Sequence, residues 1–196
     1  MSLHSVGVFC GANTGTNPLF AEQARELGHA LADRGLGLVY GGGSVGLMGE
    51  IANAVLERGG RAVGVIPQHL VDREVSHRGL TKLHIVSTMH ERKALMAELS
   101  DAFISLPGGF GTLDEMCEIL TWAQLGMHAK PMGLLNTAGF YNGFLTFLDQ
   151  AVANGFLRPQ NRDLIQVAGS VDEALSKVLT YQAPEIPRWI WDRPHV

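Results

Sequence analysis

The sequence predicts an α/β fold: a single domain built on a doubly wound (Rossmann-like), mostly parallel sheet with helices on both faces. Short apolar runs alternate with segments of helical periodicity from end to end, which is the order of elements in a parallel sheet. Glycine-rich turns follow several of these runs, at the positions where open parallel sheets bind ligands. The chain has 196 residues, of which 46% are apolar and 17% charged, enough for one sizeable core. We expect the domain over residues 1–182 and a tail over 183–196.

Seven stretches have the length and apolar content of buried strands. The segments between them carry apolar residues at helical spacing. Gly35 ends the first helix as a C′ glycine does, and Gly59-Gly60 close the second. The predicted strands are 5–10, 36–40, 61–66, 83–86, 102–106, 131–135 and 164–167. The predicted helices are 18–34, 47–58, 139–153 and 171–179, with two more that open at Thr88 and Thr112. The helix 139–153 is expected to be amphipathic, with an apolar face formed by Phe140, Phe144, Phe147, Leu148 and Ala151.

Two segments lack a regular period. Residues 68–81 are polar, which indicates an exposed loop and a candidate flap over a binding site. The prolines of the 183–196 tail disfavour regular structure. Trp189 and Trp191 make that tail too apolar to stay free in water, so we expect it to dock on the domain or on a second subunit.

The composition limits the classes of partner. A net charge of −4 argues against a nucleic-acid polymer, because domains that bind one usually carry a basic face. An anionic small molecule stays compatible, since backbone amides and a few local cations can bind it. Cys10 and Cys117 match no metal or redox spacing, so we expect buried thiols in a reducing compartment. Without a secretory pattern or an apolar run of roughly 18 residues, we expect a cytoplasmic protein that does not enter a membrane.

Residues 101–125 are the stretch around which the chain is organised. The predicted strand at 102–106 stops at P-G-G-F-G (107–111), and a helix follows. Glycines let the backbone approach a ligand, and the first N–H groups of the helix point at it with the partial positive charge of the dipole. This arrangement predicts an anion site. Its expected contacts are the amides of Gly108, Gly109, Gly111 and Thr112.

Glu115 places a carboxylate near the start of that helix and has two interpretations. It forms a capping box with Thr112 as the N-cap residue, which is a stabilising device and nothing more. Alternatively, it is held beside the sugar of a phosphate-bearing substrate. The local sequence leaves both open. Glu118 lies one turn further along the same face and is either a supporting residue of the site or a solvated charge.

A second strand–glycine–helix arrangement occurs at 41–49, with the sequence G-G-G-S-V-G-L-M-G. It matches neither the dinucleotide pattern G-x-G-x-x-G nor the Gly-Lys-Ser/Thr of a P-loop. Two such loops fit a mononucleotide, although glycines that serve only a tight turn remain the alternative. The small loop 11–15, after the first strand, also lies where parallel sheets bind ligands. The candidate substrate contacts from these loops are Gly11, Gly42, Gly43 and Ser44.

Arg92 and Lys93 follow one turn into the helix that opens at Thr88, where Thr88 and Glu91 fit a capping box. Cations near a helix N-terminus oppose the dipole, so helix stability does not explain them. This favours a guanidinium that reaches an anion or a carboxylate. Two solvated charges on an exposed helix face are the alternative.

These motifs together resemble one known family. The chain is similar to the Lonely Guy family of cytokinin riboside 5′-monophosphate phosphoribohydrolases, which are often mislabelled as lysine decarboxylases. The resemblance extends roughly over residues 6–179. Its motifs are P-G-G-F-G-T-L-D-E at 107–115, G-G-G-S-V-G-L-M-G at 41–49, M-H-E-R-K at 89–93 and T-W-A-Q-L-G-M-H-A-K-P at 121–131.

The resemblance implies specific roles for residues of this chain. It assigns Arg92 and Glu115 as the catalytic pair, and Met89 and Lys93 as substrate contacts. It also implies a homodimer in which residues near the site come from both subunits, and no metal or organic cofactor. Trp122 is expected in the core or in a subunit interface.

The expected reaction is hydrolysis of the N-glycosidic bond of adenosine 5′-monophosphate, N6-substituted or plain, to free base and ribose 5-phosphate. One alternative is a module that binds a nucleotide without chemistry. The other is a pyridoxal-phosphate lysine decarboxylase, which needs a Schiff-base lysine. None of the lysines has supporting sequence context for that role. The candidates are Lys82, Lys93, Lys130 and Lys177.

Overall fold

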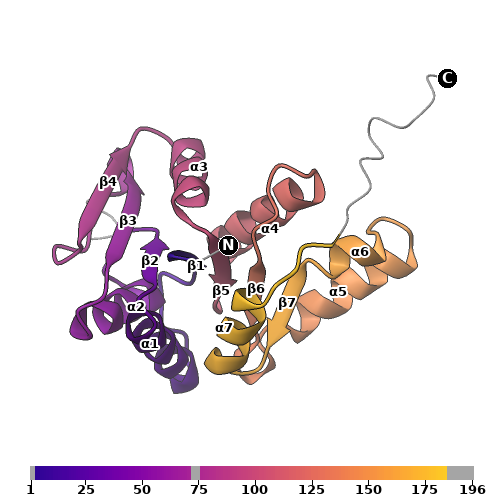
Figure 1. Cartoon of the computed structure of the whole chain (residues 1–196), viewed down its shortest axis with the longest axis horizontal. Helices are drawn as coiled ribbons and strands as arrows, with labels where there is room; N and C mark the ends of the chain where they lie inside the picture. The colour runs from indigo at the N-terminus through magenta and orange to yellow at the C-terminus, as the bar shows by residue number, and fades with distance from the viewer. Residues whose placement is uncertain (1–2, 72–75, 185–196) are drawn as a thin grey trace.

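In the computed structural model, which describes residues 3–71 and 76–184, seven strands form one sheet (Figure 1). They are β1 (Ser5–Phe9), β2 (Gly37–Tyr40), β3 (Ala62–Pro67), β4 (Lys82–Val86), β5 (Ala102–Ser105), β6 (Met132–Leu135) and β7 (Ile165–Ala168). Their order across the sheet is β4-β3-β2-β1-β5-β6-β7, and every neighbouring pair is parallel. The predicted doubly wound α/β fold is confirmed. Its direction of winding reverses between β1 and β5, where such sheets bind ligands.

The helices alternate with these strands. They are α1 (Pro18–Asp33), α2 (Gly46–Glu57), α3 (Met89–Leu99), α4 (Phe110–Gln124), α5 (Asn142–Ala153), α6 (Pro159–Arg162) and α7 (Val171–Leu179). Two short 3-10 turns, η1 (Gln68–Leu70) and η2 (Thr137–Gly139), complete the described elements. The sequence did not predict α6 or the 3-10 turns, because segments this short carry too little periodicity to be recognised.

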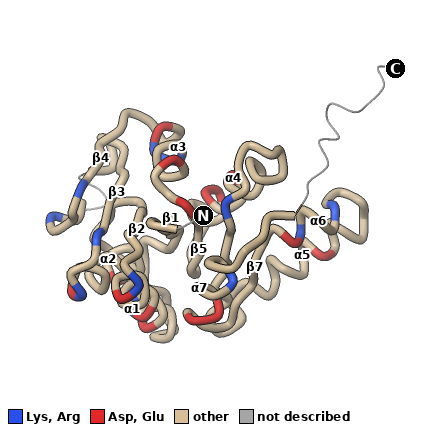
Figure 2. Tube along the Cα trace, in the orientation of Figure 1, with Lys and Arg blue, Asp and Glu red and all other residues tan. Residues whose placement is uncertain are grey.

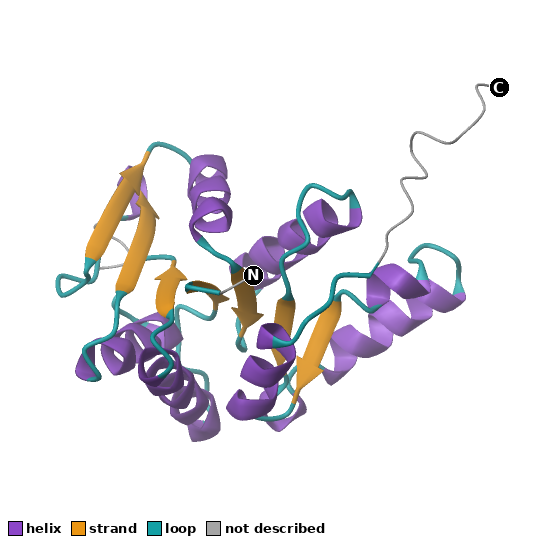
Figure 3. Ribbon diagram, viewed as in Figure 1, coloured by secondary structure: helices purple, strands orange, loops and turns teal. Residues whose placement is uncertain are grey.

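The sheet is covered on both faces, so its central strands are buried along their whole length (Figure 3). Val6 and Val8 of β1 pack with α1, α2 and α7 on one face. Phe9 packs with α3, α4 and α5 on the other face, where its ring stacks on that of Phe103 at 5.7 Å between centroids. Side chains that alternate along a strand therefore feed two separate cores.

The capping box predicted at the start of α3 is present. The Thr88 hydroxyl accepts a hydrogen bond from the N–H of Glu91 at 3.1 Å. The Glu91 carboxylate accepts one from the N–H of Ser87 at 2.7 Å, one residue before the N-cap. This local bonding fixes where α3 begins, and it places Arg92 in the first turns of the helix.

The capping box predicted for Thr112 and Glu115 is wrong. Helix α4 begins at Phe110 with Gly109 as its N-cap residue, and no side chain caps it. The Gly109 carbonyl accepts the first helical bond, from the N–H of Leu113 at 3.0 Å. Because Thr112 is already inside the helix, it cannot serve as the N-cap, and helix capping no longer explains Glu115.

The predicted helix 139–153 starts later, as α5, after a break. Ala138 adopts a left-handed backbone with φ of 52°, which interrupts a helix there. The Asn136 side chain accepts a hydrogen bond from the N–H of Tyr141 at 2.7 Å and holds this turn. No residue of α5 is fully buried, and Phe147, which was predicted on its apolar face, is 62% exposed.

Two predicted features lie partly or wholly outside the described residues. Trp189 and Trp191 of the tail lie outside them, as do residues 72–75 of the candidate flap. The described remainder of the flap returns to the 41–44 turn, where the N–H of His77 donates to the Gly42 carbonyl at 3.0 Å. Within the described ranges, the helices are all too short or too polar to cross a lipid bilayer.

We predict that Asp101 fastens the start of β1. Its Oδ2 accepts hydrogen bonds from the N–H groups of His4 at 2.8 Å and Ser5 at 3.0 Å, and from the Ser5 hydroxyl at 3.1 Å. Burial opposes ionisation, but these bonds outweigh it and hold the pKa of Asp101 below its ordinary value. Asp101→Ala should therefore lower the free energy of unfolding at pH 7 by about 2 kcal/mol.

The pH dependence of that loss follows from the depressed pKa. The stabilisation is complete above the unfolded-state pKa of about 3.9 and disappears as the carboxylate protonates at lower pH. Urea denaturation at pH 7 and pH 3 measures it, with Asp149→Ala, which removes an exposed ion pair to Arg162, as the control. An Asp101→Ala deficit that is the same at both pH values would contradict this account.

Candidate active site

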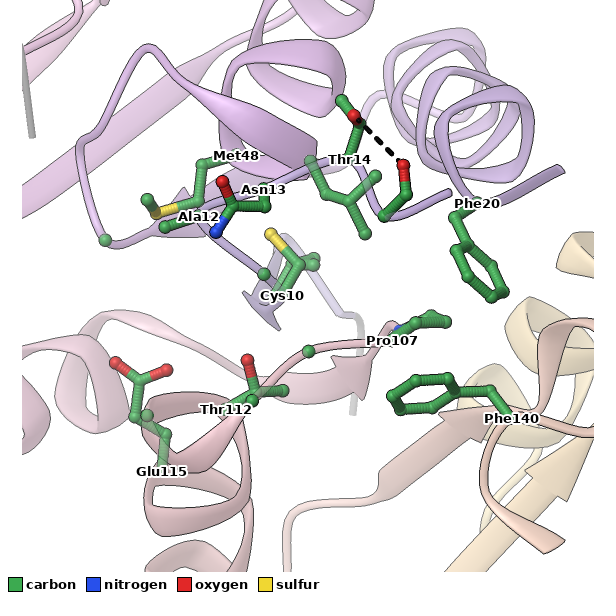
Figure 4. Close-up of a pocket in the computed structure, with 18 of the residues that line it drawn as sticks. Cys10, Ala12, Asn13, Thr14, Phe20, Met48, Pro107, Thr112, Glu115 and Phe140 are labelled. Atoms are coloured by element: carbon green, nitrogen blue, oxygen red, sulfur yellow. Dashed lines mark hydrogen bonds between the residues drawn. The ribbon is translucent and has the colours of Figure 1, made fainter. Parts of the chain in front are cut away.

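One cavity of about 420 Å³ opens at the carboxyl ends of β1, β2 and β5, beside the point where the winding reverses (Figure 4). Loops that follow three strands and side chains from four helices form its wall. Figure 4 shows Glu115 and Thr112 toward one end, Phe20 and Phe140 at the other, and Cys10 between them. The lining residues are Val8, residues 10–15, Phe20, Gly41, Leu47, Met48, Arg92, residues 107–109, Gly111, Thr112, Glu115 and Phe140.

The N-terminus of α4 forms part of this wall. The first N–H groups of a helix, here those of residues 109–112, have no partner within the helix. A Cβ atom added at Gly109 or Gly111 would meet no atom within 4 Å, so the space beside these amides is open. A Cβ at Gly108 would instead lie 2.1 Å from the Thr112 hydroxyl. Gly108 therefore serves the packing of the turn, while Gly109 and Gly111 leave room for a ligand.

Arg92 and Glu115 line the same cavity and are both buried, with 5% and 9% of their surface exposed. Arg92 comes from α3, on the β3–β4 side, and Glu115 comes from the second turn of α4. Arg92 Nη2 donates to the Gly41 carbonyl at 3.1 Å. This burial rules out the alternative in which Arg92 is a solvated surface charge. The structure brings together the two residues that the resemblance paired.

The two cysteines differ in burial. Cys10 lies in the cavity wall, where burial raises the pKa of its thiol, the charge of Glu115 raises it further and the charge of Arg92 lowers it. All three groups line the same cavity. The prediction of a buried thiol is confirmed for Cys10 and wrong for Cys117, which is exposed on α4. Cys117 follows Leu113 by four residues and precedes Leu120 by three, which places it at the edge of the apolar stripe of that helix, so the spacing alone does not show its exposure.

Lys93 faces α4 and does not line the cavity. Its Nζ lies 3.1 Å from Asp114 Oδ2 and 3.2 Å from Glu118 Oε1, and its side chain is only 11% exposed. Burial lowers the pKa of Lys93, but the bonds to these two carboxylates outweigh it and leave the pKa above its ordinary value. This gives Glu118 a place in the structure, as a partner of Lys93 that ties α4 to α3.

The predicted contacts therefore separate into two sets. Gly11, Gly108, Gly109, Gly111 and Thr112 line the cavity with the catalytic candidates. Gly42, Gly43, Ser44, Met89 and Lys93 are not part of its lining, and a direct contact between them and a substrate stays a prediction.

Two aromatic residues at the far end of the cavity were not recognised from the sequence. Phe20 of α1 and Phe140, between η2 and α5, meet edge to face with ring centroids 5.7 Å apart. Phe140 was assigned to a continuous apolar helix face, and the break at Ala138 that turns it toward the cavity leaves no sequence signal. Asn13 and Thr14, in contrast, belong to the loop 11–15 that was expected to meet a ligand.

Comparison with known proteins gives the chain relatives over most of its length. A family model described as "Possible lysine decarboxylase" matches residues 48–178. Among solved structures, the molybdenum cofactor carrier protein of Chlamydomonas reinhardtii has a TM-score of 0.69, with 24% identity over 90% of this chain and 96% of that one. The molybdenum cofactor binding protein of Rippkaea orientalis has a TM-score of 0.66 with 21% identity, over 90% and 95%. At this identity the structures establish the fold alone.

The curated relatives are much more similar in sequence. The cytokinin riboside 5′-monophosphate phosphoribohydrolase LOG7 of Arabidopsis thaliana is 47% identical over 189 residues, which cover 94% of this chain and 87% of LOG7. The cytokinin riboside 5′-monophosphate phosphoribohydrolase LOG of Oryza sativa subsp. japonica is 47% identical over 190 residues, which cover 96% of this chain and 78% of LOG. With such relatives along nearly its whole length, the chain belongs to the Lonely Guy family of cytokinin riboside 5′-monophosphate phosphoribohydrolases.

Proposed function

We propose that this chain hydrolyses the N-glycosidic bond of adenosine 5′-monophosphates, with or without an N6 substituent, and releases the free base and ribose 5-phosphate. One observation supports this most directly: a buried carboxylate, Glu115, shares a cavity with an open helix N-terminus. The names of the curated relatives, which are phosphoribohydrolases of cytokinin nucleotides, support the same reaction.

In this proposal the phosphate lies against the N-terminus of α4. The amides of residues 109–112 donate to its oxygens, and the helix dipole favours its charge. Gly109 and Gly111 leave the approach open, as the free space at both positions supports. No cation is needed in direct contact with the phosphate, which agrees with a chain whose net charge is −4.

The ribose then lies beside Glu115, one turn along the helix. Cleavage of an N-glycosidic bond builds positive charge on the sugar, so a fixed carboxylate stabilises the transition state more than the ground state. Water adds its hydroxyl to C1′, and its proton leaves with the base nitrogen. Glu115 also has the position to orient that water or to bind the ribose hydroxyls.

Arg92 is the second catalytic residue of the proposal. Its guanidinium faces the same cavity as Glu115 and favours the ionised form of a nearby carboxylate. It also has the position to donate to the leaving base. Met89 and Lys93 are the further substrate contacts that the family resemblance implies.

The alternative chemistry is not favoured. A decarboxylase that uses pyridoxal phosphate needs a lysine in its cavity, and no lysine occurs among the described residues that line this one. Lys93 is engaged by two carboxylates, and Lys130 donates to the Ala97 carbonyl at 2.7 Å. In the described part of the chain, no group of His, Cys, Asp and Glu side chains is arranged to hold a metal ion.

The proposal extends to location and partners. We propose a cytoplasmic enzyme that binds no nucleic-acid polymer. Figure 2 supports the second point, since positions of Lys and Arg are interspersed with positions of Asp and Glu along the trace in this view. We also propose a homodimer, because large apolar side chains are exposed on α5 and just after the C-terminal ends of α4 and α5, two helices that cover the same face of the sheet (Figure 1). These side chains are Leu125, Met127, Phe147 and Phe156.

Glu115→Gln tests the carboxylate. The substitution keeps the shape of the side chain and removes the charge, so AMP binding should stay within a few-fold while release of adenine falls by about 100-fold or more. Chromatography of free base and calorimetric titration with AMP measure the two effects. Glu98→Gln, on the exposed side of α3, is the matched control and should leave both unchanged. Undiminished base release by Glu115→Gln would disprove the assignment.

Phe147→Glu tests the dimer. The native chain should elute with twice the mass of 21.1 kDa by light scattering, and the variant should shift toward the monomer because a charge is costly in an apolar interface. Glu22→Gln, exposed on the opposite face of the sheet, should leave the mass unchanged. A native protein that is monomeric at micromolar concentration would contradict the proposal.

A further inference from the structure

The two glycine-rich turns look alike in sequence but differ in what surrounds them. Around the 41–49 turn, protein atoms occupy the places where Cβ atoms would lie. A Cβ at Gly46 would be 2.2 Å from the Ala12 carbonyl carbon, and one at Gly49 would be 2.2 Å from the Ser44 oxygen. Gly109 and Gly111 of the other turn have nothing within 4 Å. The first turn is therefore filled by the protein, while the second is open to a ligand.

Gly41 faces the guanidinium of Arg92. A Cβ added at Gly41 would lie 1.9 Å from Arg92 Nη2 and 3.1 Å from its Cζ. Gly41 is not among the glycines with positive φ, unlike its neighbour Gly42 at φ of 80°. Since φ at Gly41 is outside the left-handed region, what requires glycine there is the space that Arg92 occupies.

The same residue also binds the arginine. The Gly41 carbonyl accepts the hydrogen bond from Arg92 Nη2 at 3.1 Å. A buried cation needs acceptors, and the N-terminus of α3, whose dipole opposes a positive charge, does not favour it. A second nitrogen of the planar guanidinium, Nη1, donates to the sulfur of Met89 at 3.9 Å, so the two contacts together restrict its orientation. Gly41 thus supplies both the room for Arg92 and a bond that orients it.

The turn that carries Gly41 is itself fastened to the cavity wall. The N–H of Leu47 donates to the Gly11 carbonyl at 3.0 Å, and Gly46 packs against the backbone of Ala12 and Asn13. Gly11 in turn donates its N–H to the Pro107 carbonyl at 3.0 Å. The position of Arg92 is therefore linked through backbone contacts to the turn that precedes α4.

We propose that the 41–49 turn is a socket for Arg92 and not a second phosphate site, with Gly41 as the positioning residue of the socket. This inference rests on the proposed function, because it takes Arg92 as a catalytic group. Gly41 acts on the reaction only through the arginine.

A double-mutant cycle over Gly41→Ala and Arg92→Ala tests the socket. Gly41→Ala alone should lower kcat for adenine release by about 10-fold or more, with a smaller change in KM, because a misplaced arginine fails mainly in the transition state. In the Arg92→Ala background the same substitution should change kcat by less than about 2-fold, since its target is gone. A loss of equal size in both backgrounds would overturn the proposal.

Thermal unfolding gives a second, independent arm. Arg92→Ala removes the two atoms nearest to a Cβ at Gly41 and leaves Met48 Sδ at 3.3 Å, so the double variant should recover much of the decrease in melting temperature caused by Gly41→Ala. Gly28→Ala is the matched control: its Cβ would lie 2.6 Å from the Ile51 carbonyl, far in sequence from the arginine, and its deficit should persist in the Arg92→Ala background. If Gly41→Ala lowers the melting temperature by the same amount in the Arg92→Ala background, the proposal that the turn is a socket for Arg92 is wrong.

The two arms separate this inference from the proposed function. If Arg92→Ala releases base at the native rate, the catalytic role of Arg92 is wrong, and with it the claim that Gly41 positions a catalytic group. The unfolding arm then still decides whether the turn is a socket for the side chain. If Arg92→Ala loses activity and both couplings appear, the proposal stands.

Discussion

The burial of Arg92 and Glu115 in one cavity wall is the constraint on which the rest of the site depends. A charge removed from water needs partners nearby, or the site is destabilised. The fold supplies them from distant parts of the sequence: α3 carries the guanidinium, β2 ends at the carbonyl that binds it, and α4 carries the carboxylate. Lys93 and its two carboxylate partners tie α3 to α4 and so help to fix the separation of the helices that bear the charged pair.

The two glycine-rich turns have different roles because the atoms around them are packed differently. Near Arg92 the backbone must come close to other protein atoms, and glycine is needed because any side chain would collide with them. At the start of α4, glycine keeps space free beside unpaired helical N–H groups. The same residue type therefore serves positioning in one turn and ligand access in the other. A phosphate at α4 and a sugar beside Glu115 are consistent with that division.

Most of the fold was predictable because local pattern and topology agree. Each strand is a short apolar run between turns, and each long helix has a C′ glycine or an apolar stripe, so the α/β order followed directly. The misses have physical causes. Thr112 looked like an N-cap residue, but the helix begins one turn earlier, where the Gly109 carbonyl accepts the first helical hydrogen bond. Phe20 and Phe140 meet across the cavity only through a left-handed turn at Ala138, which no local pattern announces.

The site was predictable to the extent that its residues lie in contiguous motifs. Arg92, Glu115 and the open amides of α4 were found that way. The contact between Gly41 and Arg92 joins residues 51 positions apart, so it can be recognised only in the folded chain.

A crystal structure of Glu115→Gln with AMP tests the central claim most directly. We expect phosphate oxygens within hydrogen-bonding distance of the amides of residues 109–112, and the residue 115 side chain beside the ribose. A phosphate bound instead in the 41–44 turn, with residue 115 directed away from the sugar, would contradict it.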